Sequence, residues 1–281
     1  MQRNFVILSH GRSGSTWLVN TINNIGDISC YGEMFRDRPE VNKDEGPQLP
    51  LFGLWRRESR GVRPWVTYRY LNEIIYSRDQ TTGFKLLYVH LLRFAEVGLY
   101  IISKRVSVIH LIRRNILNSV LSSLVAPKRG KFHFKTGDAI PDEEPIWLDP
   151  KTVLRKIRSI DRKTRRARTF LKLLGPQQRL EVYYEDLDAN ALNFKVIWDF
   201  LGANFEKDPP MSQLEKSRKK GPAEIILNYR EVQETLAKAV TSISSNNEIK
   251  RQTLGLVKNQ PTWKQAPKVG SWDYNRSFAD Y

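Results

Sequence analysis

Cysteine occurs once in the 281 residues, at Cys30, so the chain can build neither a disulfide framework nor a cysteine-rich zinc site. A reducing, intracellular compartment fits this composition best. No apolar run approaches the length of a membrane span, and the run Phe5 to Leu8 is also too short for a signal peptide. We therefore expect a cytoplasmic protein without a membrane span.

Acidic residues are scarce relative to basic ones. The chain has 46 Lys and Arg against 30 Asp and Glu, a formal net charge of +16. Such an excess predicts an anionic partner. The candidates are nucleotides, nucleic acids, acidic glycans and lipid surfaces. The hydrophobic share of 40% provides one sizeable core, which excludes disordered, coiled-coil and collagen-like chains.

Short apolar runs alternate with helical patterns along the chain. This alternation predicts an α/β layered domain with a central, mainly parallel sheet flanked by helices. We expect a single domain over residues 1–281. The expected strands are 5–8, 83–87, 106–112 and 180–184, and the expected helices are 16–25, 116–125, 151–174, 191–200 and 225–240.

Three stretches lack this alternation. Residues 36–82 and 126–150 are rich in Arg, Lys, Pro, Gly and Trp, and we expect them to form lids or acceptor-binding loops. Residues 259–281 predict an irregular tail packed on the core.

The strongest local signal lies between the first strand and the first helix, from Ser9 to Leu18. In this position the backbone N–H groups of a helix N-terminus form a phosphate cradle, where Gly14 allows close approach and hydroxyl groups add donors. An ordinary strand-to-helix turn with a serine N-cap is the alternative.

Two absences narrow the choice of phosphate. A Walker A loop has a Lys just before its Ser or Thr, but Ser15 stands at that place here, and the cation is Arg12. The strand 106–112 is followed by Arg113 and Arg114 instead of a magnesium-binding Asp. The loop therefore predicts a nucleotide without a γ-phosphate and without an obligatory metal.

Residues 12–18 resemble the 5′-phosphosulfate loop of the sulfotransferases that use 3′-phosphoadenylyl sulfate (PAPS). That loop begins with Lys or Arg and continues through Ser-Gly-Ser/Thr-Thr to an apolar pair. The resemblance implies a P-loop-like fold, PAPS as sulfuryl donor, adenosine 3′,5′-bisphosphate as product, and contact of Arg12 with the 5′-phosphate and bridging oxygen. It assigns donor binding to Arg12, Ser13, Gly14, Ser15, Thr16 and Trp17.

The second fingerprint of the family is a strand ending in Arg with a Ser eight residues later, the pair binding the 3′-phosphate. Arg114 and Ser122 have this spacing. On a helix, residues four apart lie near one face, so we expect Arg114, Asn118 and Ser122 to share a polar stripe. A strand-to-helix turn with solvated arginines is the alternative.

Two basic segments are rival candidates for closing over the nucleotide. Residues 216–221 resemble the Arg-Lys-Gly loop of cytosolic relatives, which implies donor contacts for Arg218 and Lys219. Residues 268–272 resemble the basic-Gly-Trp segment of other members. A solvated basic loop is the alternative for each.

Sulfuryl transfer to an alcohol needs a group that takes the hydroxyl proton. The segment 31–35 resembles the Gly-Glu segment of bacterial carbohydrate sulfotransferases, which implies that Glu33 is the general base and that the acceptor is a carbohydrate. A surface glutamate in a turn is the alternative. The rival base is His90, as in cytosolic members with a Lys and a His at a strand end, although its gap from Lys85 is longer than theirs.

The remaining candidates near the site have different expected roles. Lys85 is expected to bind the sulfuryl oxygens or the acceptor, against a solvated lysine at a strand end. We expect His10 to shape the turn and His110, on a core strand, to be a buried histidine with its hydrogen bonds satisfied.

Residues 151–172 contain ten basic residues and one acidic residue, Asp161. Alone, they predict a nucleic-acid-binding or membrane-surface helix, or the solvated face of an outer helix. So lopsided a charge also attracts PAPS and an acidic or sulfated glycan. We therefore predict a PAPS-dependent sulfotransferase that acts by in-line transfer without a nucleic-acid partner. The alternative is a non-catalytic nucleic-acid or polyanion-binding protein that uses residues 151–172.

Overall fold

The computed structural model describes residues 3–24, 28–36, 49–129, 134–135, 144–189, 191–203, 214–215 and 221–241. By its internal contacts the chain divides into two units, Met1–Val232 and Gln233–Tyr281. Helix α11 (Tyr229–Thr241) crosses this boundary, and the other elements lie in the first unit. A single domain over residues 1–281 stays a prediction.

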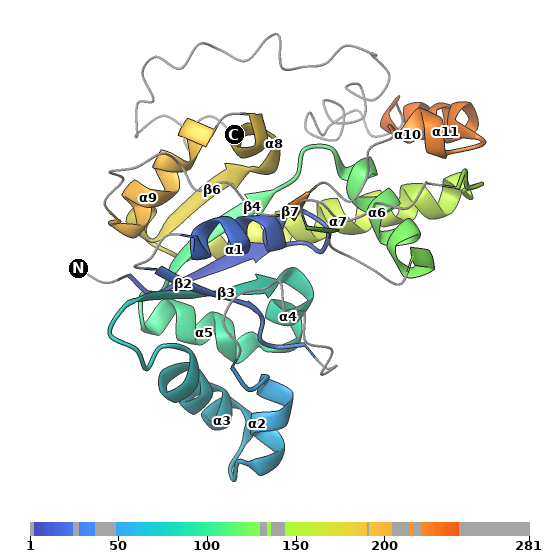
Figure 1. Ribbon diagram of the computed structural model, residues 1–281. Coiled ribbons are helices and arrows are strands. Elements are labelled where there is room, and N and C mark those ends of the chain that lie inside the picture. The colour runs from blue at the N-terminus through green and yellow to red at the C-terminus, as the bar shows by residue number, and fades with distance from the viewer. Residues whose placement is uncertain are drawn as a thin grey trace. The chain divides into compact units, whose positions relative to one another are not determined.

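A sheet of five parallel strands forms the centre of the first unit (Figure 1), which confirms the expected parallel sheet. Because all strands are parallel, their carboxyl ends meet at one edge, where ligands of open α/β sheets bind. The four expected strands are present, and a fifth, β2, was not expected. In spatial order the strands are β2 (Ile28–Glu33), β3 (Thr81–Leu87), β1 (Phe5–Ser9), β4 (Ser107–Ile112) and β6 (Arg179–Tyr183).

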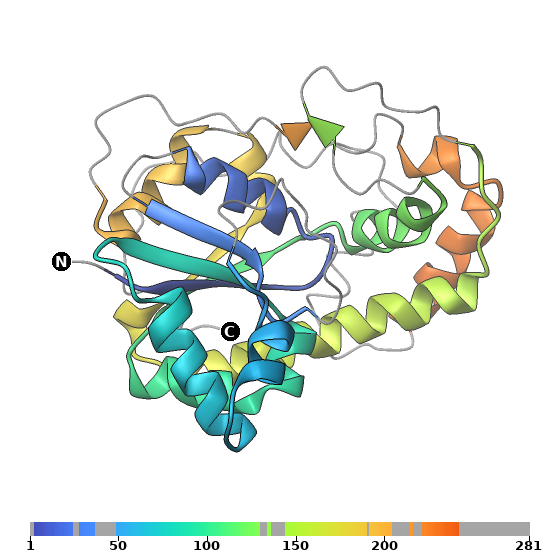
Figure 2. The same ribbon diagram turned by 60° about the horizontal axis from the view of Figure 1, so that its bottom comes forward.

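Helices cover both faces of the sheet (Figures 1 and 2). Successive strand residues point to opposite faces, so Val6 and Leu8 join one apolar cluster while Phe5 and Ile7 join the other. The first cluster includes residues of α2 (Phe52–Glu58), α3 (Arg63–Tyr70), α5 (Ala95–Ser103) and α7 (Pro150–Leu171). The second includes residues of α1 (Ser15–Asn23), α8 (Tyr184–Ala189) and α9 (Lys195–Leu201).

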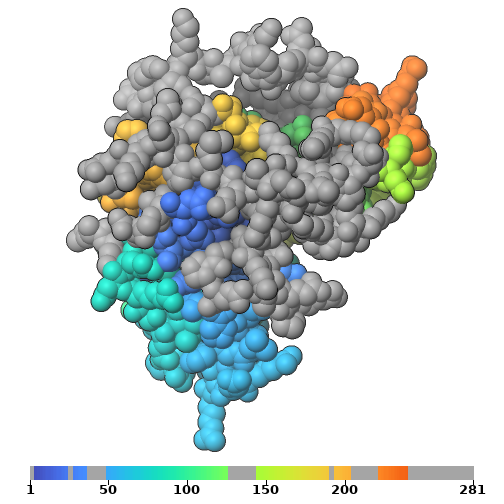
Figure 3. All heavy atoms as spheres, viewed as in Figure 1, coloured from blue at the N-terminus to red at the C-terminus, as the bar shows by residue number. Residues whose placement is uncertain are grey.

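Residues 36–82 are mainly helical and not an irregular loop in the part that the structure describes, and their role as a lid or acceptor-binding segment stays a prediction. Helices α2 and α3, a π-helical turn (Leu71–Ile75) and the start of β3 lie there, and Phe52, Val66 and Tyr70 are buried in the first cluster. Pro64 lies in the first turn of α3, where proline is tolerated, so it does not break the helix. In the space-filling view, α2 and α3 form an exposed end of this helical layer (Figure 3).

The second expected loop, residues 126–150, is helical at its start and at its end. Helix α6 (Ile116–Arg129) continues four residues past its expected end, and α7 begins at Pro150. Between them, β5 (Phe134–Lys135) pairs with β7 (Leu214–Glu215), and Ile146 forms a bridge with Ile226. The expected tail, residues 259–281, lies outside the described residues.

Helix α7 coincides with most of the basic segment. Asp149 caps its N-terminus, accepting hydrogen bonds from the N–H groups of Lys151 (3.2 Å) and Thr152 (3.0 Å). One stripe of the helix is buried, which includes Val153, Ile157, Ala167 and Leu171. No helix within the described ranges is long and apolar enough to cross a bilayer.

Candidate active site

The loop between β1 and α1 turns on Gly14, the N-cap residue of α1. Gly14 has φ of 90°, in the left-handed region, and a Cβ atom there would collide with the ring of Tyr184. Its carbonyl accepts the first helical hydrogen bond, from Leu18 N at 3.0 Å. Only glycine therefore satisfies both the backbone geometry and the close approach of Tyr184, and the N–H groups of the first turn of α1 border the loop.

Two buried polar atoms of this loop have no hydrogen-bond partner in the part of the chain that the structure describes. They are the hydroxyl of Ser13 and Nε2 of His10. The other ring nitrogen of His10 lies 2.6 Å from the carbonyl of Gly11, which ties the ring to the turn. Burial lowers the pKa of His10 to about 4. The ring is therefore neutral at pH 7, and the unsatisfied Ser13 hydroxyl suits a phosphate ligand at the start of α1.

The two predicted phosphate motifs meet in the structure. Arg12 donates a hydrogen bond of 2.8 Å from Nε to the hydroxyl of Ser122 on α6. The carbonyl of Arg12 accepts bonds from the Ser119 hydroxyl (3.1 Å) and from Nη1 of Arg113 (3.2 Å). Sequence reasoning missed Ser119 and Arg113, and their place beside Ser122 and Arg114 was the available signal.

Aromatic rings pack against the residues of the loop. The guanidinium of Arg113 lies over the ring of Tyr184, 4.7 Å from its centroid. The ring of Trp17 packs edge-on against Tyr184 and also contacts Phe194, at centroid distances of 5.3 and 5.4 Å. Tyr184 therefore supports the loop, and Trp17 is packed between the Tyr184 and Phe194 rings.

Arg114 does not share a helical stripe with Asn118 and Ser122, because α6 begins after it, at Ile116. The preceding Asn115 accepts a bond from the N–H of Asn118 (3.0 Å), as a helix cap does. Arg114 forms a two-bond ion pair with Asp186, and its guanidinium lies 4.0 Å from the centroid of Tyr183. Both partners are half-exposed, and such pairs contribute little to stability. Its role at the 3′-phosphate stays a prediction.

A buried ion pair links the strand ends to the loop. Nζ of Lys85 on β3 lies 2.8 Å from Oε1 of Glu33 on β2, and it donates a bond of 2.9 Å to the hydroxyl of Thr16 on α1. The Lys85 side chain is 5% exposed and that of Glu33 is 19% exposed. The carboxylate, the lysine and the loop hydroxyl therefore form one connected group, and Lys85 is not a solvated lysine.

A bulge in β2 makes this pair possible. In the register of the sheet, Tyr31 lies opposite Phe84 and Glu33 lies opposite Lys85. Phe84 and Lys85 point to opposite faces, whereas residues two apart in a regular strand share a face. The irregularity between Tyr31 and Glu33 turns the glutamate to the face of Lys85. Glu33 therefore ends a strand and is not a surface residue of a turn.

The other histidines are placed differently. His90 is buried on α4 (Tyr88–Arg93), three residues past the end of β3. His110 is fully buried and bonds Tyr88 through Nε2 (2.6 Å) and Glu181 through Nδ1 (3.0 Å), so its expected satisfaction is confirmed. Burial alone would raise the pKa of Glu181, but hydrogen bonds from His110 and Arg168 outweigh it and lower the pKa to about 2.

Some predicted residues lie outside the described ranges. Arg218, Lys219 and the rival segment 268–272 are among them, so their donor contacts stay predictions. Within the described ranges, no group of three or more His, Cys, Asp or Glu side chains is arranged to hold a metal ion.

Comparisons place this site in a known fold. No protein-family model and no curated protein matches the chain. A solved sulfotransferase from Alicyclobacillus acidocaldarius superposes with a TM-score of 0.51 over 94% of this chain and 100% of its own, at 12% identity. The chain has the sulfotransferase fold. Mouse sulfotransferase SULT7A1 complexed with PAP aligns over 92% of this chain and 89% of its own, with 11% identity and a TM-score of 0.46.

The sulfotransferase fold confirms the predicted P-loop-like α/β architecture. In this chain the fold brings the loop after β1, the start of α6 and the ends of β2 and β3 to one edge of the sheet. A loop at a helix N-terminus and a carboxylate held by a lysine thus lie side by side, an arrangement that suits transfer of an anionic group to a hydroxyl.

Proposed function

We propose that the protein is a sulfotransferase that moves the sulfuryl group of PAPS to a hydroxyl of a carbohydrate. The observation that carries this proposal is the connection of Glu33, through Lys85, to Thr16 of the phosphate-type loop. It places a proton acceptor beside the loop that would hold the donor. The single cysteine favours a cytoplasmic site of action.

The residues present fit such a donor. The N–H groups at the start of α1 and the unsatisfied hydroxyl of Ser13 would bind the 5′-phosphate, in a turn whose backbone only Gly14 allows because the Tyr184 ring packs against it. Arg12 would stabilise the charge that builds up on the leaving phosphate. Ser122 and Arg114 would bind the 3′-phosphate, with Arg114 exchanging its Asp186 partner for the ligand.

Glu33 would take the proton of the acceptor hydroxyl. As the acceptor oxygen bonds to sulfur, the bond from sulfur to the bridging oxygen breaks, and adenosine 3′,5′-bisphosphate leaves with that electron pair. Lys85 holds the Glu33 carboxylate at 2.8 Å, and its positive charge beside the loop would stabilise the sulfuryl oxygens. The reaction is thus a matter of positioning and charge, with one proton transferred to the protein.

The carbohydrate preference rests on the Gly-Glu resemblance and on exposed aromatic rings. Trp65 and Trp147 are 59% and 61% exposed, and such rings stack on sugar faces. Trp55, in contrast, is packed against the first apolar cluster and is not available for stacking. The rival proposal, a non-catalytic nucleic-acid or polyanion-binding protein, is favoured by the net charge of +16 and the basic residues of α7, but it leaves the Glu33–Lys85 pair unexplained.

Two measurements test the proposal. The purified protein should transfer label from PAPS to at least one member of a panel of glycans and alcohols. Adenosine 3′,5′-bisphosphate at a hundred times its Kd should stabilise the fold by about 2.7 kcal/mol, whereas ATP with magnesium should do much less. Equal stabilisation by the two nucleotides, or none by the bisphosphate, would remove the PAPS assignment.

A further inference from the structure

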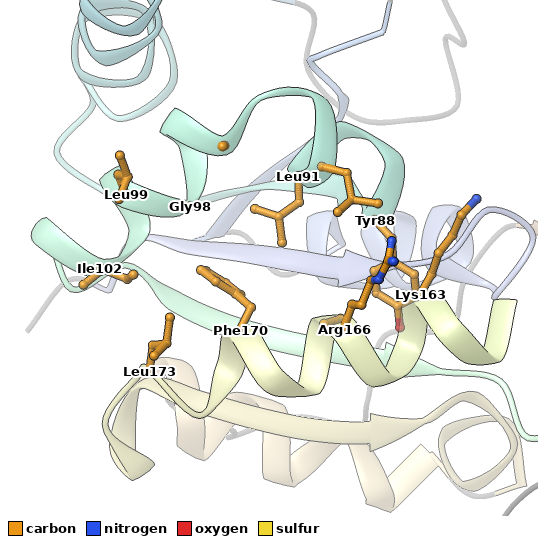
Figure 4. Close-up of a pocket in the computed structure, with 12 residues that line it drawn as sticks. Tyr88, Leu91, Gly98, Leu99, Ile102, Lys163, Arg166, Phe170 and Leu173 are labelled. Carbon is orange, nitrogen blue, oxygen red and sulfur yellow. The ribbon is translucent and has the colours of Figure 1, made fainter. Parts of the chain in front are cut away.

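An apolar groove of about 270 Å³ runs between α5 and α7, with strands of the sheet behind it and α4 at one end (Figure 4). We call it the α5–α7 groove. It lies against the first apolar cluster, on the face of the sheet opposite α1 and the Glu33–Lys85 pair. At its charged end the ring of Tyr88 lies 6.3 Å from the ring of His10, so this end of the groove borders the loop. Its apolar lining includes Leu91, Leu92, Leu99, Ile102, Phe170 and Leu173.

Large apolar side chains at the rim of the groove are unusually exposed. Leu99 and Leu173 are 69% and 68% exposed, and Leu92 is 53% exposed. The groove is narrow where Gly98 of α5 approaches Phe170 of α7. A Cβ atom on Gly98 would lie 3.3 Å from the Phe170 ring. Contiguous exposed apolar surface beside charged residues marks a binding site.

Charge is present at only one end of the groove. Lys163 and Arg166 of α7 lie there beside Tyr88, while Leu99, Ile102 and Leu173 lie at the other end (Figure 4). Among the described residues, none that lines the groove is acidic. Along the same helix Arg165 pairs with Asp161 and Arg168 pairs with Glu181, but Lys163 and Arg166 have no ion-pair partner within the described ranges.

We infer that the α5–α7 groove binds a linear alkyl chain with a single anionic head group, of the fatty-acid type. The alkyl chain lies along the leucines and Phe170, and the head group pairs with Lys163 and Arg166. The placement of charge argues for this occupant. An acidic amphipathic helix would need cations along the sides of the groove, and a bilayer would need them in a ring around protruding apolar side chains.

The test is calorimetric titration of the full chain with decanoate below its micelle concentration. We expect saturable binding of one decanoate. Butyrate and 1-decanol should bind at least about tenfold more weakly, because butyrate lacks the long alkyl chain and 1-decanol lacks the negative charge. Decanol binding as tightly as decanoate would overturn the inference, and so would the absence of decanoate binding.

Variants with matched controls locate the site. Leu99→Ser and the double change of Lys163→Gln with Arg166→Gln should each weaken decanoate about tenfold. Leu54→Ser, at an exposed leucine of α2, and Lys151→Gln with Arg155→Gln, at exposed cations outside the groove, should leave it unchanged. Ala95→Trp, which fills the groove from α5, should abolish binding.

Two outcomes would contradict this placement. Decanoate binding that survives Ala95→Trp and the double charge change would show that the ligand binds elsewhere. Sedimentation with phosphatidylglycerol vesicles, lost in Leu99→Ser, without any binding of free decanoate would show that the face docks to a bilayer. Neither readout depends on sulfuryl transfer, so the groove and the proposed function can fail separately.

Discussion

Arg12 and Ser122 lie 110 positions apart in sequence, yet the guanidinium of one donates a 2.8 Å hydrogen bond to the hydroxyl of the other. The bond joins the loop after β1 to α6, and the Ser122 side chain is buried beneath it. Two motifs that resemble separate phosphate sites thus form one surface. A donor with phosphates at both ends of its ribose would exchange this internal bond for bonds to itself.

Arg12 and Arg114 should have different roles in binding and in turnover. Arg114→Ala should weaken binding of adenosine 3′,5′-bisphosphate about tenfold, because it removes a contact to a phosphate that does not react. Arg12→Ala should also lower turnover by about 10² to 10³, because charge builds up on the leaving phosphate. Steady-state kinetics with PAPS separate the two effects. An Arg12→Ala variant changed only in KM would contradict its catalytic role.

Gly14 should tolerate no side chain. Gly14→Ala places a Cβ atom against the Tyr184 ring at a φ of 90°, so we expect a loss of about 1–3 kcal/mol in the free energy of unfolding and loss of bisphosphate binding. Gly11→Ala is the matched control, because no atom lies within 4 Å of its added Cβ. Urea denaturation and calorimetry measure both effects. Equal behaviour of the two variants would argue against the close approach at Gly14.

The sequence was informative where contacts are local. Strand β1, its loop and α1 follow one another without interruption, as do β4 and α6. Apolar periodicity and glycine placement therefore predict both of these strand-to-helix segments. Strand β2 was missed because Ile28–Glu33 mixes polar and apolar residues and is recognisable only from its pairing with β3. Helices α2 and α3 were missed because Arg, Pro and Trp obscure their buried positions.

The candidate site was predictable as a set of residues but not as an arrangement. Glu33 and Lys85 were proposed for separate reasons, and their ion pair depends on a bulge that no periodicity reveals. Arg113 and Arg114 are neighbours in sequence, yet one bonds the carbonyl of Arg12 in the loop and the other pairs with Asp186. Such differences arise from the direction of the chain as it leaves a strand, which tertiary packing decides.

Breaking the Glu33–Lys85 pair should also affect stability. Lys85→Met removes the lysine partner of a largely buried carboxylate, at an expected cost of about 1–3 kcal/mol. The double variant with Glu33→Leu should recover part of that loss, which a double-mutant cycle in urea would measure. Lys195→Met, in the exposed pair with Asp199, is the control and should cost less than about 0.5 kcal/mol. Strict additivity at Glu33 and Lys85 would contradict their coupling.

His10 should make stability depend on pH. Its pKa is about 4 in the native protein against an ordinary 6.5, so the unfolded chain binds more protons between these values. The free energy of unfolding therefore rises with pH across this window and falls as the pH drops through it. From pH 7 to pH 5 the parent should lose about 2 kcal/mol more than His10→Gln. Urea titrations at the two pH values test this, and parallel losses would contradict the burial of a neutral ring.

The assignment of the base is tested by removing its basicity while keeping its shape. Glu33→Gln retains size and some hydrogen bonding, so we expect turnover to fall by about 10² to 10⁴ with bisphosphate binding nearly unchanged. The acidic limb of the pH-rate profile, which in the parent reports protonation of the base, should flatten in the variant. Kinetics with labelled PAPS across pH, together with calorimetry, provide both readouts.

His90→Ala is the control for the rival base. His90 lies on α4, past the end of β3, whereas Glu33 contacts Lys85 at the strand ends, so the His90 variant should keep substantial activity. If His90→Ala abolished turnover while Glu33→Gln kept most of it, proton transfer would belong to the histidine. The carbohydrate preference would then lose its main support, because it rests on the glutamate, but the donor site at Arg12 and Gly14 would stand on its own measurements.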